Sequence, residues 1–382
     1  MARISRACSG ATRAYCPRSM LGRMTATTRP SDARSDSLTR QVWRIPKAGS
    51  LARLALVEEH LPAPGAGEVQ VEVQTVGVNF ADVFACLGLY SATPRGSFIP
   101  GLECAGRIRR IGAGVSGWRE GDAVIVLTRF GGYASHLNVD ARTLWPLPQG
   151  WSLDDAAAYP VQALTAWYGL VPLGAAKAGS IVLVQSAAGG VGINALHALR
   201  RLQARPVALV GSASKRDWLI ERFELDPRAV VIRGPSLAHD LDAALAHYNG
   251  RGFDLVLDAV YGEGFQIAFD RLAPEGRHVL YGAADFMGAG KRPNFLRLAW
   301  QYLRRPRLDP LAMIPLNRGL LAFNLIWLWE QASRLPESMR ATLELIPERP
   351  HIGGAFPFDR AHDALAAIQS GRTTGKLILR LS

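Results

Sequence analysis

One stretch constrains the fold of this chain more than any other: residues 183–196, LVQSAAGGVGINAL, run from apolar residues through a glycine-rich turn and back. The segment SIVLVQ before the turn has the composition of a buried strand, and INALHALRRL after it has helical periodicity. The spacing Ala187-x-Gly189-x-x-Gly192 is that of a dinucleotide-binding turn with alanine in the first slot. A strand that leads through such a turn into a helix predicts a nucleotide-binding domain.

The glycines of this turn have separate physical reasons. A side chain at Gly189 would block the approach of the backbone to a pyrophosphate, and one at Gly192 would push the helix off its strand. The helix N-terminus supplies free N–H groups and a partial positive charge to the phosphates. We therefore expect five residues to form the cofactor-binding turn: Ala188, Gly189, Gly190, Val191 and Gly192. The alternative is a tight turn with a purely structural role.

The rest of the chain divides into two regions that differ in their pattern of strands, helices and turns. Between residues 181 and 283, apolar strands alternate with amphipathic helices, which is typical of a parallel sheet covered on both faces. Residues 41–150 instead contain short strands and glycine-rich turns, which predict a small β-rich domain. The fold class is therefore α/β, a Rossmann doubly wound parallel sheet plus a β-rich domain. We expect a disordered leader at 1–36, a β-rich catalytic domain from 37–160 and 330–382, and the Rossmann domain at 161–329.

The end of the second strand of the Rossmann domain indicates which dinucleotide binds. An NAD site usually places an acidic residue about 20 residues after the glycine turn, where it binds the ribose hydroxyls. Here the strand PVALVG is followed by SASKRD, with no acid at its tip. Lysine pairs with a phosphate and hydroxyls donate to it, so Ser212 and Lys215 favour the 2′-phosphate of NADP(H). The alternative is that Lys215 and Arg216 are solvated residues of the following helix.

Composition excludes several classes of function. The net charge is +12, but residues 1–36 hold seven arginines against two aspartates, in a composition that predicts a flexible tail rather than a transit peptide. Because much of the surplus charge lies in this leader and no recognition motif is present, we expect no nucleic-acid partner. The longest apolar run is shorter than the ~20 residues of a membrane span. The cysteines Cys8, Cys16, Cys86 and Cys104 form no CxxC pair, which fits a reducing, cytoplasmic location.

At these motifs the chain resembles the medium-chain dehydrogenase/reductase superfamily, and within it the zinc-independent quinone oxidoreductase branch. The matching segments follow the family's order: GVNFADV (77–83), GLY (88–90), IPGLECAGRI (99–108), GDAV (121–124), QALTAW (162–167), QSAAGGVG (185–192), FDLVLDAVYG (253–262) and GKLILR (375–380). The segment IPLNRGLLAFNLIWL is similar to one in the vesicle amine transport protein-1 (VAT-1) subgroup. The resemblance implies a GroES-like fold for the β-rich domain and a homodimer formed through the edge strand at LLAFNLIW.

Two departures from the alcohol dehydrogenase pattern bear on metal binding. Zinc-dependent relatives place a cysteine where Asn79 stands and a histidine where Leu102 stands. A catalytic zinc needs three protein ligands and an open position, which Glu103 and Cys104 alone cannot supply. We therefore expect no metal. Quinones and α,β-unsaturated carbonyls suit a site without one, since hydride addition to them gives a delocalised phenolate or enolate, and the protein supplies orientation and a dry cleft.

The resemblance also implies three candidate catalytic residues. It places Asn79 and Asp82 in the cleft near the nicotinamide, and it makes Tyr90 a candidate proton donor or hydrogen-bond partner of the substrate carbonyl. Each has a structural alternative. Asn79 could close a turn, Asp82 could cap the helix ADVFACLG, and Tyr90 could be a wall residue.

Four further residues belong to the predicted cofactor site. Thr165 would lie beside the nicotinamide ribose or ring, as the resemblance implies. Tyr281 and Gly282 end a strand at the carboxyl edge of the sheet, where ligands bind in open α/β sheets. The resemblance also places Lys376 near the cofactor, with an exposed lysine at the start of a strand as an equal alternative.

One basic segment suggests a rival function. Residues 291–307, KRPNFLRLAWQYLRRPR, hold six basic residues and no acids, so a helix here is a candidate for peripheral membrane contact. We favour instead a surface helix whose aromatic residues pack on the protein itself or over the substrate cleft. Two hypotheses follow: an NADPH-dependent reductase of a small quinone or enone, or a nucleotide-binding, membrane-associated lipid-handling or regulatory protein with little turnover. The presence of Tyr90, Asn79 and Thr165 favours the enzyme.

Overall fold

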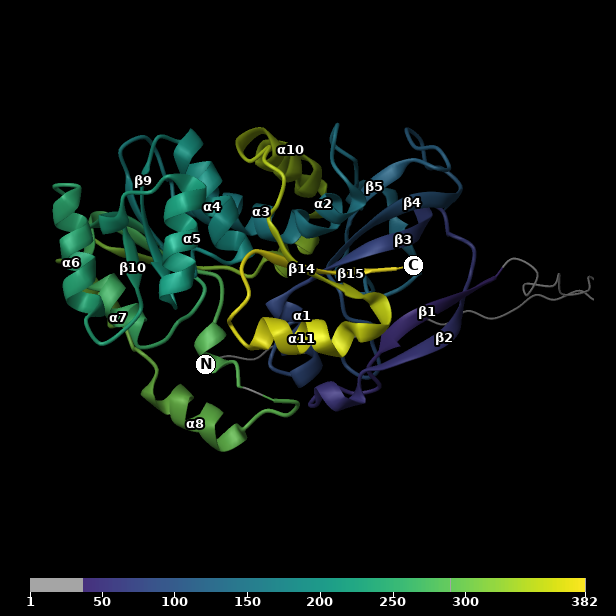
Figure 1. Cartoon of the computed structure of the whole chain (residues 1–382). Coiled ribbons are helices and arrows are strands. Elements are labelled where there is room, and N and C mark those ends of the chain that lie inside the picture. The colour runs from purple at the N-terminus through teal and green to yellow at the C-terminus, as the bar shows by residue number, and fades with distance from the viewer. Residues whose placement is uncertain (1–36, 289, 382) are drawn as a thin grey trace, which may run out of the picture. The chain divides into compact units, whose positions relative to one another are not determined.

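Six parallel strands form one sheet in the computed structural model, which describes residues 37–288 and 290–381 (Figure 1). Their order is β10-β9-β8-β11-β12-β13, and every neighbouring pair is parallel. The strands are β8 (Ile181–Gln185), β9 (Arg205–Val210), β10 (Val230–Ile232), β11 (Phe253–Asp258), β12 (Leu272–Leu280) and β13 (Gly319–Ala322). The doubly wound sheet predicted from the sequence is confirmed. The predicted leader, 1–36, lies outside the described residues.

Helices bury both faces of this sheet. They are α3 (Pro160–Tyr168), α4 (Gly190–Arg201), α5 (Ala213–Phe223), α6 (Leu237–His247) and α7 (Gly264–Phe269). Val182 and Val184 of β8 share a core with α3 and α4, whereas Ile181 and Leu183 share a second core with α6 and α7. Successive side chains of a strand point to opposite faces, so a strand covered on both sides is apolar throughout. This burial explains the continuous apolar run IVLV.

A second sheet joins the two ends of the described chain. Its main path is β14-β15-β3-β4-β5-β7, β6 pairs with β3, and β1 and β2 form a separate antiparallel pair. The strands are β1 (Leu38–Arg44), β2 (Ala55–Leu61), β3 (Glu68–Val78), β4 (Glu103–Ile111), β5 (Ala123–Leu127), β6 (His136–Asp140), β7 (Leu144–Pro146), β14 (Ile352–Pro357) and β15 (Lys376–Arg380). β15 lies antiparallel to β3. The predicted β-rich domain is therefore assembled from chain segments that precede and follow the parallel sheet in the sequence.

The remaining helices connect or cover these sheets. They are α1 (Phe80–Leu87), α2 (Leu153–Ala158), α8 (Phe295–Arg304), α9 (Pro310–Met313), α10 (Leu335–Leu345) and α11 (Ala361–Gln369), with a π-helical turn at Gly169–Leu173 and a 3-10 segment at Leu325–Arg334. The side chains of Leu335 and Met339 on α10 join the core of α3 and α4, although the predicted boundary at 330 assigns them to the β-rich domain. Within the described residues, no helix is long and apolar enough to cross a bilayer.

Candidate functional site

The glycine-rich turn connects β8 to α4 at the carboxyl edge of the parallel sheet. Gly189 is the N-cap residue, and the Ile193 N–H donates to the Gly189 carbonyl oxygen at 2.9 Å. A Cβ placed on Gly192 would lie 2.5 Å from the Cα atom of Ala187. Real Cβ atoms do not approach backbone so closely, so α4 can pack on its strand only with glycine there. The predicted packing reason for Gly192 is confirmed.

We expect Gly192→Ala to lower the free energy of unfolding by about 1–3 kcal/mol, because the added methyl group must displace backbone rather than a flexible side chain. Denaturant unfolding and NADPH titration of the same variant would measure both the loss of stability and the displacement of the turn. Gly234→Ala is the matched control, since a Cβ at Gly234 meets nothing within 4 Å. Equal stability of the two variants would contradict the packing argument.

Gln162 is a buried residue with no role predicted from the sequence. It lies on α3, is 9% exposed, and its side-chain oxygen Oε1 has no hydrogen-bond partner among the described residues. A Cβ on Gly190 would lie 1.6 Å from this oxygen, so the amide of Gln162 occupies the space that a side chain at the start of α4 would need. A buried acceptor without a donor usually marks a group that a ligand or water satisfies. The sequence feature that could have identified Gln162 is its position as the first residue of the motif QALTAW, which also contains Thr165.

The segment before β15 borders the same turn. The Gly375 N–H donates to the Ala188 carbonyl oxygen at 2.9 Å, and Gly375 forms an isolated parallel bridge with Gly189. Gly375 has a φ of +66°, and a Cβ on it would lie 2.3 Å from the His351 carbonyl oxygen. This backbone bridge joins the β-rich part of the chain directly to the glycine turn.

Ser212 and Lys215 lie at the turn after β9, as predicted. The Ser212 hydroxyl caps α5 by accepting the Lys215 N–H, and the Lys215 ammonium donates to the Gly371 carbonyl oxygen at 2.6 Å. Partial burial lowers the pKa of Lys215 from its usual value. Arg216 points elsewhere, because its guanidinium donates to the carbonyl oxygens of Pro227 and Val230. Of the two cations in SASKRD, only Lys215 reaches toward the segment that borders the glycine turn.

Three polar side chains form a buried cluster beneath this segment. The Asn79 amide donates to Glu103 Oε1 at 2.7 Å, and the Lys376 ammonium donates to Asn79 Oδ1 at 2.7 Å and forms an ion pair with Glu103. The second oxygen of Glu103 accepts the Val161 N–H at the start of α3, at 2.7 Å. Lys376 and Glu103 are both 0% exposed, so the alternative of an exposed lysine at position 376 is wrong. The cluster connects β4, β15, α1 and α3.

Asp82 makes the contacts of a helix-capping and loop-anchoring residue. Its carboxylate accepts the Asn79 N–H at 2.8 Å, the Gly101 N–H at 3.2 Å and the Tyr133 hydroxyl at 3.1 Å. Burial nevertheless raises the pKa of Asp82 to about 7, and burial also raises the pKa of Tyr133 well above its usual value. With a 1% exposed side chain, Asp82 supports the loop at Gly101 rather than a solvent-filled cleft in this structure.

The raised pKa of Asp82 predicts a pH dependence of stability. Its pKa is about 7 in the native state against a usual value of 3.8, so the native state holds this proton more tightly than the unfolded state. The resulting stabilisation is complete below about pH 4 and is lost as the pH rises through about 7. Relative to Asp82→Asn, which does not titrate, the unfolding free energy of the wild type should fall on the order of 2 kcal/mol between about pH 5 and 8.

Denaturant unfolding of both proteins across this pH range measures the difference. Asp309→Asn, which changes an exposed cap of α9, is the control and should give a profile parallel to the wild type. Parallel profiles for Asp82→Asn and the wild type would contradict the assignment.

Tyr90 contacts Asn324, which lies in the segment IPLNRGLLAFNLIWL and had no role predicted from the sequence. The Tyr90 hydroxyl donates to Asn324 Oδ1 at 2.7 Å, and the Asn324 amide donates to the Ser91 hydroxyl at 3.3 Å. Burial raises the pKa of Tyr90 to about 12, so the phenol keeps its proton at neutral pH. Asn324 follows β13, and the pair connects the two halves of the described chain across 234 positions.

Of the other predicted cofactor residues, Tyr281 and Gly282 lie at the carboxyl edge of the parallel sheet, and Thr165 lies on α3. Tyr281 directly follows β12, its N–H donates to the Asp258 carbonyl oxygen at 2.9 Å, and its ring stacks 6.0 Å from that of Phe323. A Cβ on Gly282 would lie 2.5 Å from the Ala259 carbonyl oxygen, so this turn passes close to the end of β11. Thr165 is 6% exposed, and its hydroxyl donates to the Val161 carbonyl oxygen at 2.6 Å.

The glycine turn, Ser212 and Tyr281 lie at the carboxyl edge of the parallel sheet, because they follow β8, β9 and β12. The strand order reverses at β8, between β9 and β11, which is where open α/β sheets bind ligands. Within the described part of the chain, no group of three or more His, Cys, Asp or Glu side chains could hold a metal ion.

Two family profiles match the chain. One describes an alcohol dehydrogenase GroES-like domain and covers residues 65–149, and the other describes a zinc-binding dehydrogenase and covers residues 236–379. The first match confirms the GroES-like fold that the resemblance implied for the β-rich domain. The two profiles together cover β3 to β7 of the second sheet and β11 to β13 of the parallel sheet.

Named relatives and a solved structure show the same likeness. A Danio rerio "synaptic vesicle membrane protein VAT-1 homolog" is 31% identical over 333 residues, which cover 85% of this chain and 66% of that protein. A Bos taurus "quinone oxidoreductase-like protein 2" is 32% identical over 348 residues, covering 89% and 93%. The quinone oxidoreductase of Thermus thermophilus, solved also with NADPH, superposes with a TM-score of 0.68 at 29% identity, over 89% of this chain and 100% of that one.

Proposed function

Because this chain belongs to the medium-chain dehydrogenase/reductase superfamily, we propose that it is an NADPH-dependent oxidoreductase that reduces a quinone or an α,β-unsaturated carbonyl compound. The observation that carries the proposal is the glycine turn at the switch point of the parallel sheet, with Lys215 rather than a carboxylate after the next strand. The names of the quinone oxidoreductase relatives support the same reaction class.

The residues at the sheet edge fit NADP(H). The α4 N-terminus and the glycine turn would hold the pyrophosphate, while Lys215 and Ser212 would hold the 2′-phosphate. The unpartnered oxygen of Gln162 lies next to Gly190, at the start of α4, and could accept a hydrogen bond from a bound nucleotide. NADPH supplies a hydride when it is bound. The chain's own contribution is to position the nucleotide and to exclude water.

Tyr90 and Asn324 would hold the acceptor. A phenol that stays protonated can donate a hydrogen bond to a carbonyl oxygen and stabilise the negative charge that develops there. The Tyr90 hydroxyl donates its hydrogen bond to Asn324 Oδ1 in this structure, so we propose that Asn324 positions the hydroxyl and gives up this hydrogen bond when the phenol donates to the acceptor.

We also propose that the reaction needs no zinc. The family profile that covers residues 236–379 carries a zinc-binding description, but the polar cluster of Asn79, Glu103 and Lys376 does not supply the ligands of a catalytic zinc. Glu103 is engaged on both oxygens, and the Lys376 ammonium already neutralises it. Asn79 is a neutral amide in the same cluster. A zinc ion here would have to displace a buried ammonium and would find a single carboxylate, so the cluster does not fit a catalytic zinc site.

The proposed function is tested by following NADPH oxidation by the purified full chain with a panel of quinones and α,β-unsaturated aldehydes and ketones. We expect turnover with members of this panel and no change after treatment with a metal chelator. If NADPH binds but no acceptor is reduced, the chain is a nucleotide-binding protein without reductase activity, and the proposal is wrong.

Tyr90→Phe should lower kcat about tenfold, because it removes one hydrogen bond to the charged oxygen of the transition state. The KM for NADPH should not change, since Tyr90 is proposed to contact the acceptor. Steady-state kinetics with the best acceptor would measure both constants. Tyr248→Phe is the matched control, because the Tyr248 hydroxyl donates to the Pro206 carbonyl oxygen away from the sheet edge. An unchanged kcat in Tyr90→Phe would remove Tyr90 from the mechanism.

We propose a homodimer formed through β13. This strand is one edge of the parallel sheet, and Leu320 on it is 39% exposed. The side chains of Leu311, Ile314 and Leu316 just before it are 75%, 73% and 45% exposed. An open edge with exposed apolar neighbours is suited to pairing with the same edge of a second copy. Light scattering of the full chain gives the molecular mass that tests this pairing.

A further inference from the structure

The amphipathic helix α8 exposes its large apolar side chains to solvent, which is unusual for a helix that packs on its own protein. None of its residues is buried, and Leu296 and Leu303 are 87% and 65% exposed. Phe295, Trp300 and Tyr302 are 70%, 58% and 58% exposed. Figure 1 shows α8 at the periphery of the described chain, away from both sheets. The expectation that its aromatic residues pack on the protein is therefore wrong.

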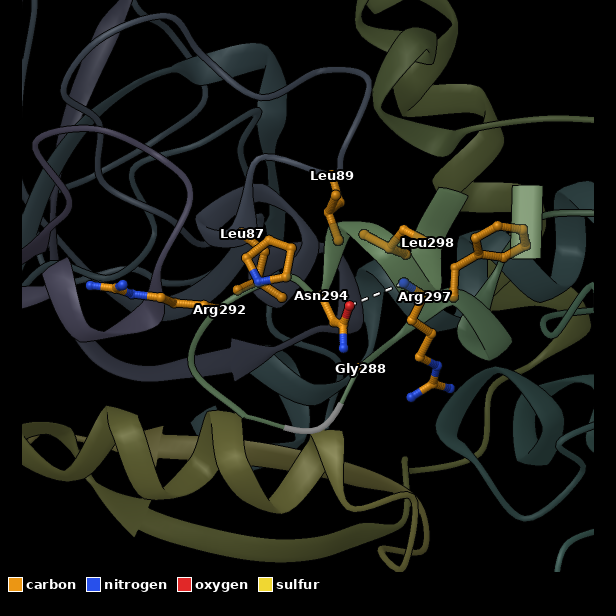
Figure 2. Close-up of a pocket in the computed structure, with 9 residues that line it drawn as sticks. Leu87, Leu89, Gly288, Arg292, Asn294, Arg297 and Leu298 are labelled. Atoms are coloured by element: carbon orange, nitrogen blue, oxygen red, sulfur yellow. Dashed lines mark hydrogen bonds between the residues drawn. The ribbon is translucent and has the colours of Figure 1, made fainter. Parts of the chain in front are cut away.

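The side of α8 opposite its exposed leucines contacts the rest of the protein. At 100° per residue, Leu298 and Gln301 lie opposite Leu296 and Leu303. The Gln301 side-chain amide donates to the Asp285 carbonyl oxygen at 3.0 Å. Leu298 packs near Leu89, around a cavity of about 10 Å³ that could hold a single water molecule (Figure 2). This cavity is too small to bind a ligand, and the contact around it only attaches α8 to the rest of the protein. The opposite arc of the helix, which carries Leu296 and Leu303 and is called the apolar arc below, stays exposed to solvent.

Positive charge surrounds this apolar arc. The segment 291–307 contains six basic residues and no acid: Lys291, Arg292, Arg297, Arg304, Arg305 and Arg307. The guanidinium of Arg304 lies 4.5 Å from the ring centre of Trp300, and that of Arg305 lies 3.7 Å from the ring centre of Tyr302. In Figure 2 the side chains of Arg292 and Arg297 extend away from the contact between Leu298 and Leu89. Cations, interfacial aromatics and exposed leucines thus belong to one surface.

We propose that α8 binds the surface of an anionic lipid bilayer. A helix with a large apolar arc and basic flanks lies in the interfacial plane, with its apolar side chains inserted about 5–10 Å and its cations among acidic headgroups. Tryptophan and tyrosine, each with a polar group on an apolar ring, suit this boundary. A second copy of the chain is a poor occupant, because a twofold contact at α8 would bring two sets of like charges together. The proposal does not depend on the proposed reductase activity.

Co-sedimentation of the full chain with vesicles tests the proposal. We expect binding to phosphatidylcholine vesicles that contain about 30% phosphatidylserine, weaker binding as salt is raised, and little binding to pure phosphatidylcholine. Arg297→Gln with Arg304→Gln should lower partitioning about 30-fold, because two cations are lost. Leu296→Ser with Leu303→Ser should lower it by at least about tenfold. All four side chains are exposed, so the variants should fold and bind NADPH as the wild type does.

Matched controls lie elsewhere on the surface. Arg340→Gln on α10 removes one exposed cation, and Val57→Ser on β2 removes one exposed apolar side chain, and both variants should bind vesicles like the wild type. Equal binding to neutral and anionic vesicles, or full binding by both double variants, would overturn the proposal. A lower molecular mass of Leu296→Ser with Leu303→Ser in light scattering would also overturn it, by showing that α8 contacts a second copy.

Discussion

Glu103→Gln is expected to lower the free energy of unfolding by about 3–5 kcal/mol, the largest effect of any single change considered. The substitution leaves the Lys376 ammonium buried without its counter-charge, since both side chains are 0% exposed. A buried charge that loses its partner keeps its desolvation penalty and gains nothing in return. Lys376→Met should destabilise the chain for the same reason, because it strands the carboxylate of Glu103.

The double variant Glu103→Gln with Lys376→Met separates this charge effect from a loss of packing. It removes both charges, so it should be more stable than either single variant. Arg380→Met is the matched control on the same strand, β15. It breaks an ion pair with Asp154 in which the arginine side chain is 58% exposed, and such pairs contribute less than about 1 kcal/mol. Additive losses in the double variant would contradict a direct coupling between Glu103 and Lys376.

Loss of the ion pair should also weaken NADPH binding. The Lys376 side chain anchors the start of β15, and Gly375, its neighbour, donates to the carbonyl oxygen of Ala188 in the glycine turn. A shift of β15 is therefore transmitted to the turn through one backbone hydrogen bond. NADPH titration of the Glu103→Gln variant, under conditions where it is fully folded, would measure this coupling.

Lys215→Ala is expected to raise the Kd for NADPH about 10–100-fold and to leave the Kd for NADH nearly unchanged. The ammonium of Lys215 is partly buried and donates to the Gly371 carbonyl oxygen. No carboxylate of the described chain offsets its positive charge, since burial alone lowers the pKa of Lys215. A 2′-phosphate would supply the missing counter-charge, whereas the bare ribose of NADH would not. Fluorescence titration with the two nucleotides measures the preference directly.

Arg216→Ala is the control for this prediction. Arg216 is the neighbouring cation of the same turn, but its guanidinium is used by the Pro227 and Val230 carbonyl oxygens. The variant should keep the preference for NADPH. Equal affinity of the wild type for NADPH and NADH would show that the absence of an acid after β9 has no bearing on the 2′-phosphate.

Local patterns were sufficient to predict most of the fold. The strand SIVLVQ, the turn and the helix that follows are contiguous, so the composition of a few residues reports their burial and conformation. Gly192 is the clearest case, because a contact only five positions away, at Ala187, explains why no side chain is tolerated. The domain boundary at 330 stays a prediction, because the core that α10 joins holds residues of both sheets. The apolar spacing of α10 shows that one face is buried but not which sheet it covers.

The site residues were predicted with less detail. Asn79, Asp82 and Lys376 were selected through a family resemblance as cleft or cofactor residues, and the structure places all three in buried polar contacts. Tyr90 was selected, but its partner Asn324 was not. Gln162 stood in a quoted motif without a role. Hydrogen-bond partners of this kind leave no periodic trace in a sequence.

The sequence by itself determined the α/β class, the glycine turn, the lack of an acid after β9 and the basic character of residues 291–307, because each depends on neighbours along the chain. Only the tertiary structure decided that Lys376 neutralises Glu103, that Tyr90 meets Asn324 and that α8 turns its leucines outward. The first two pairs are separated by 273 and 234 positions. Their contacts exist only because β15 lies beside β3 and because the chain after β13 returns to Tyr90. The orientation of α8 is set by its packing against the end of α1 and by Asp285, which its own periodicity cannot encode.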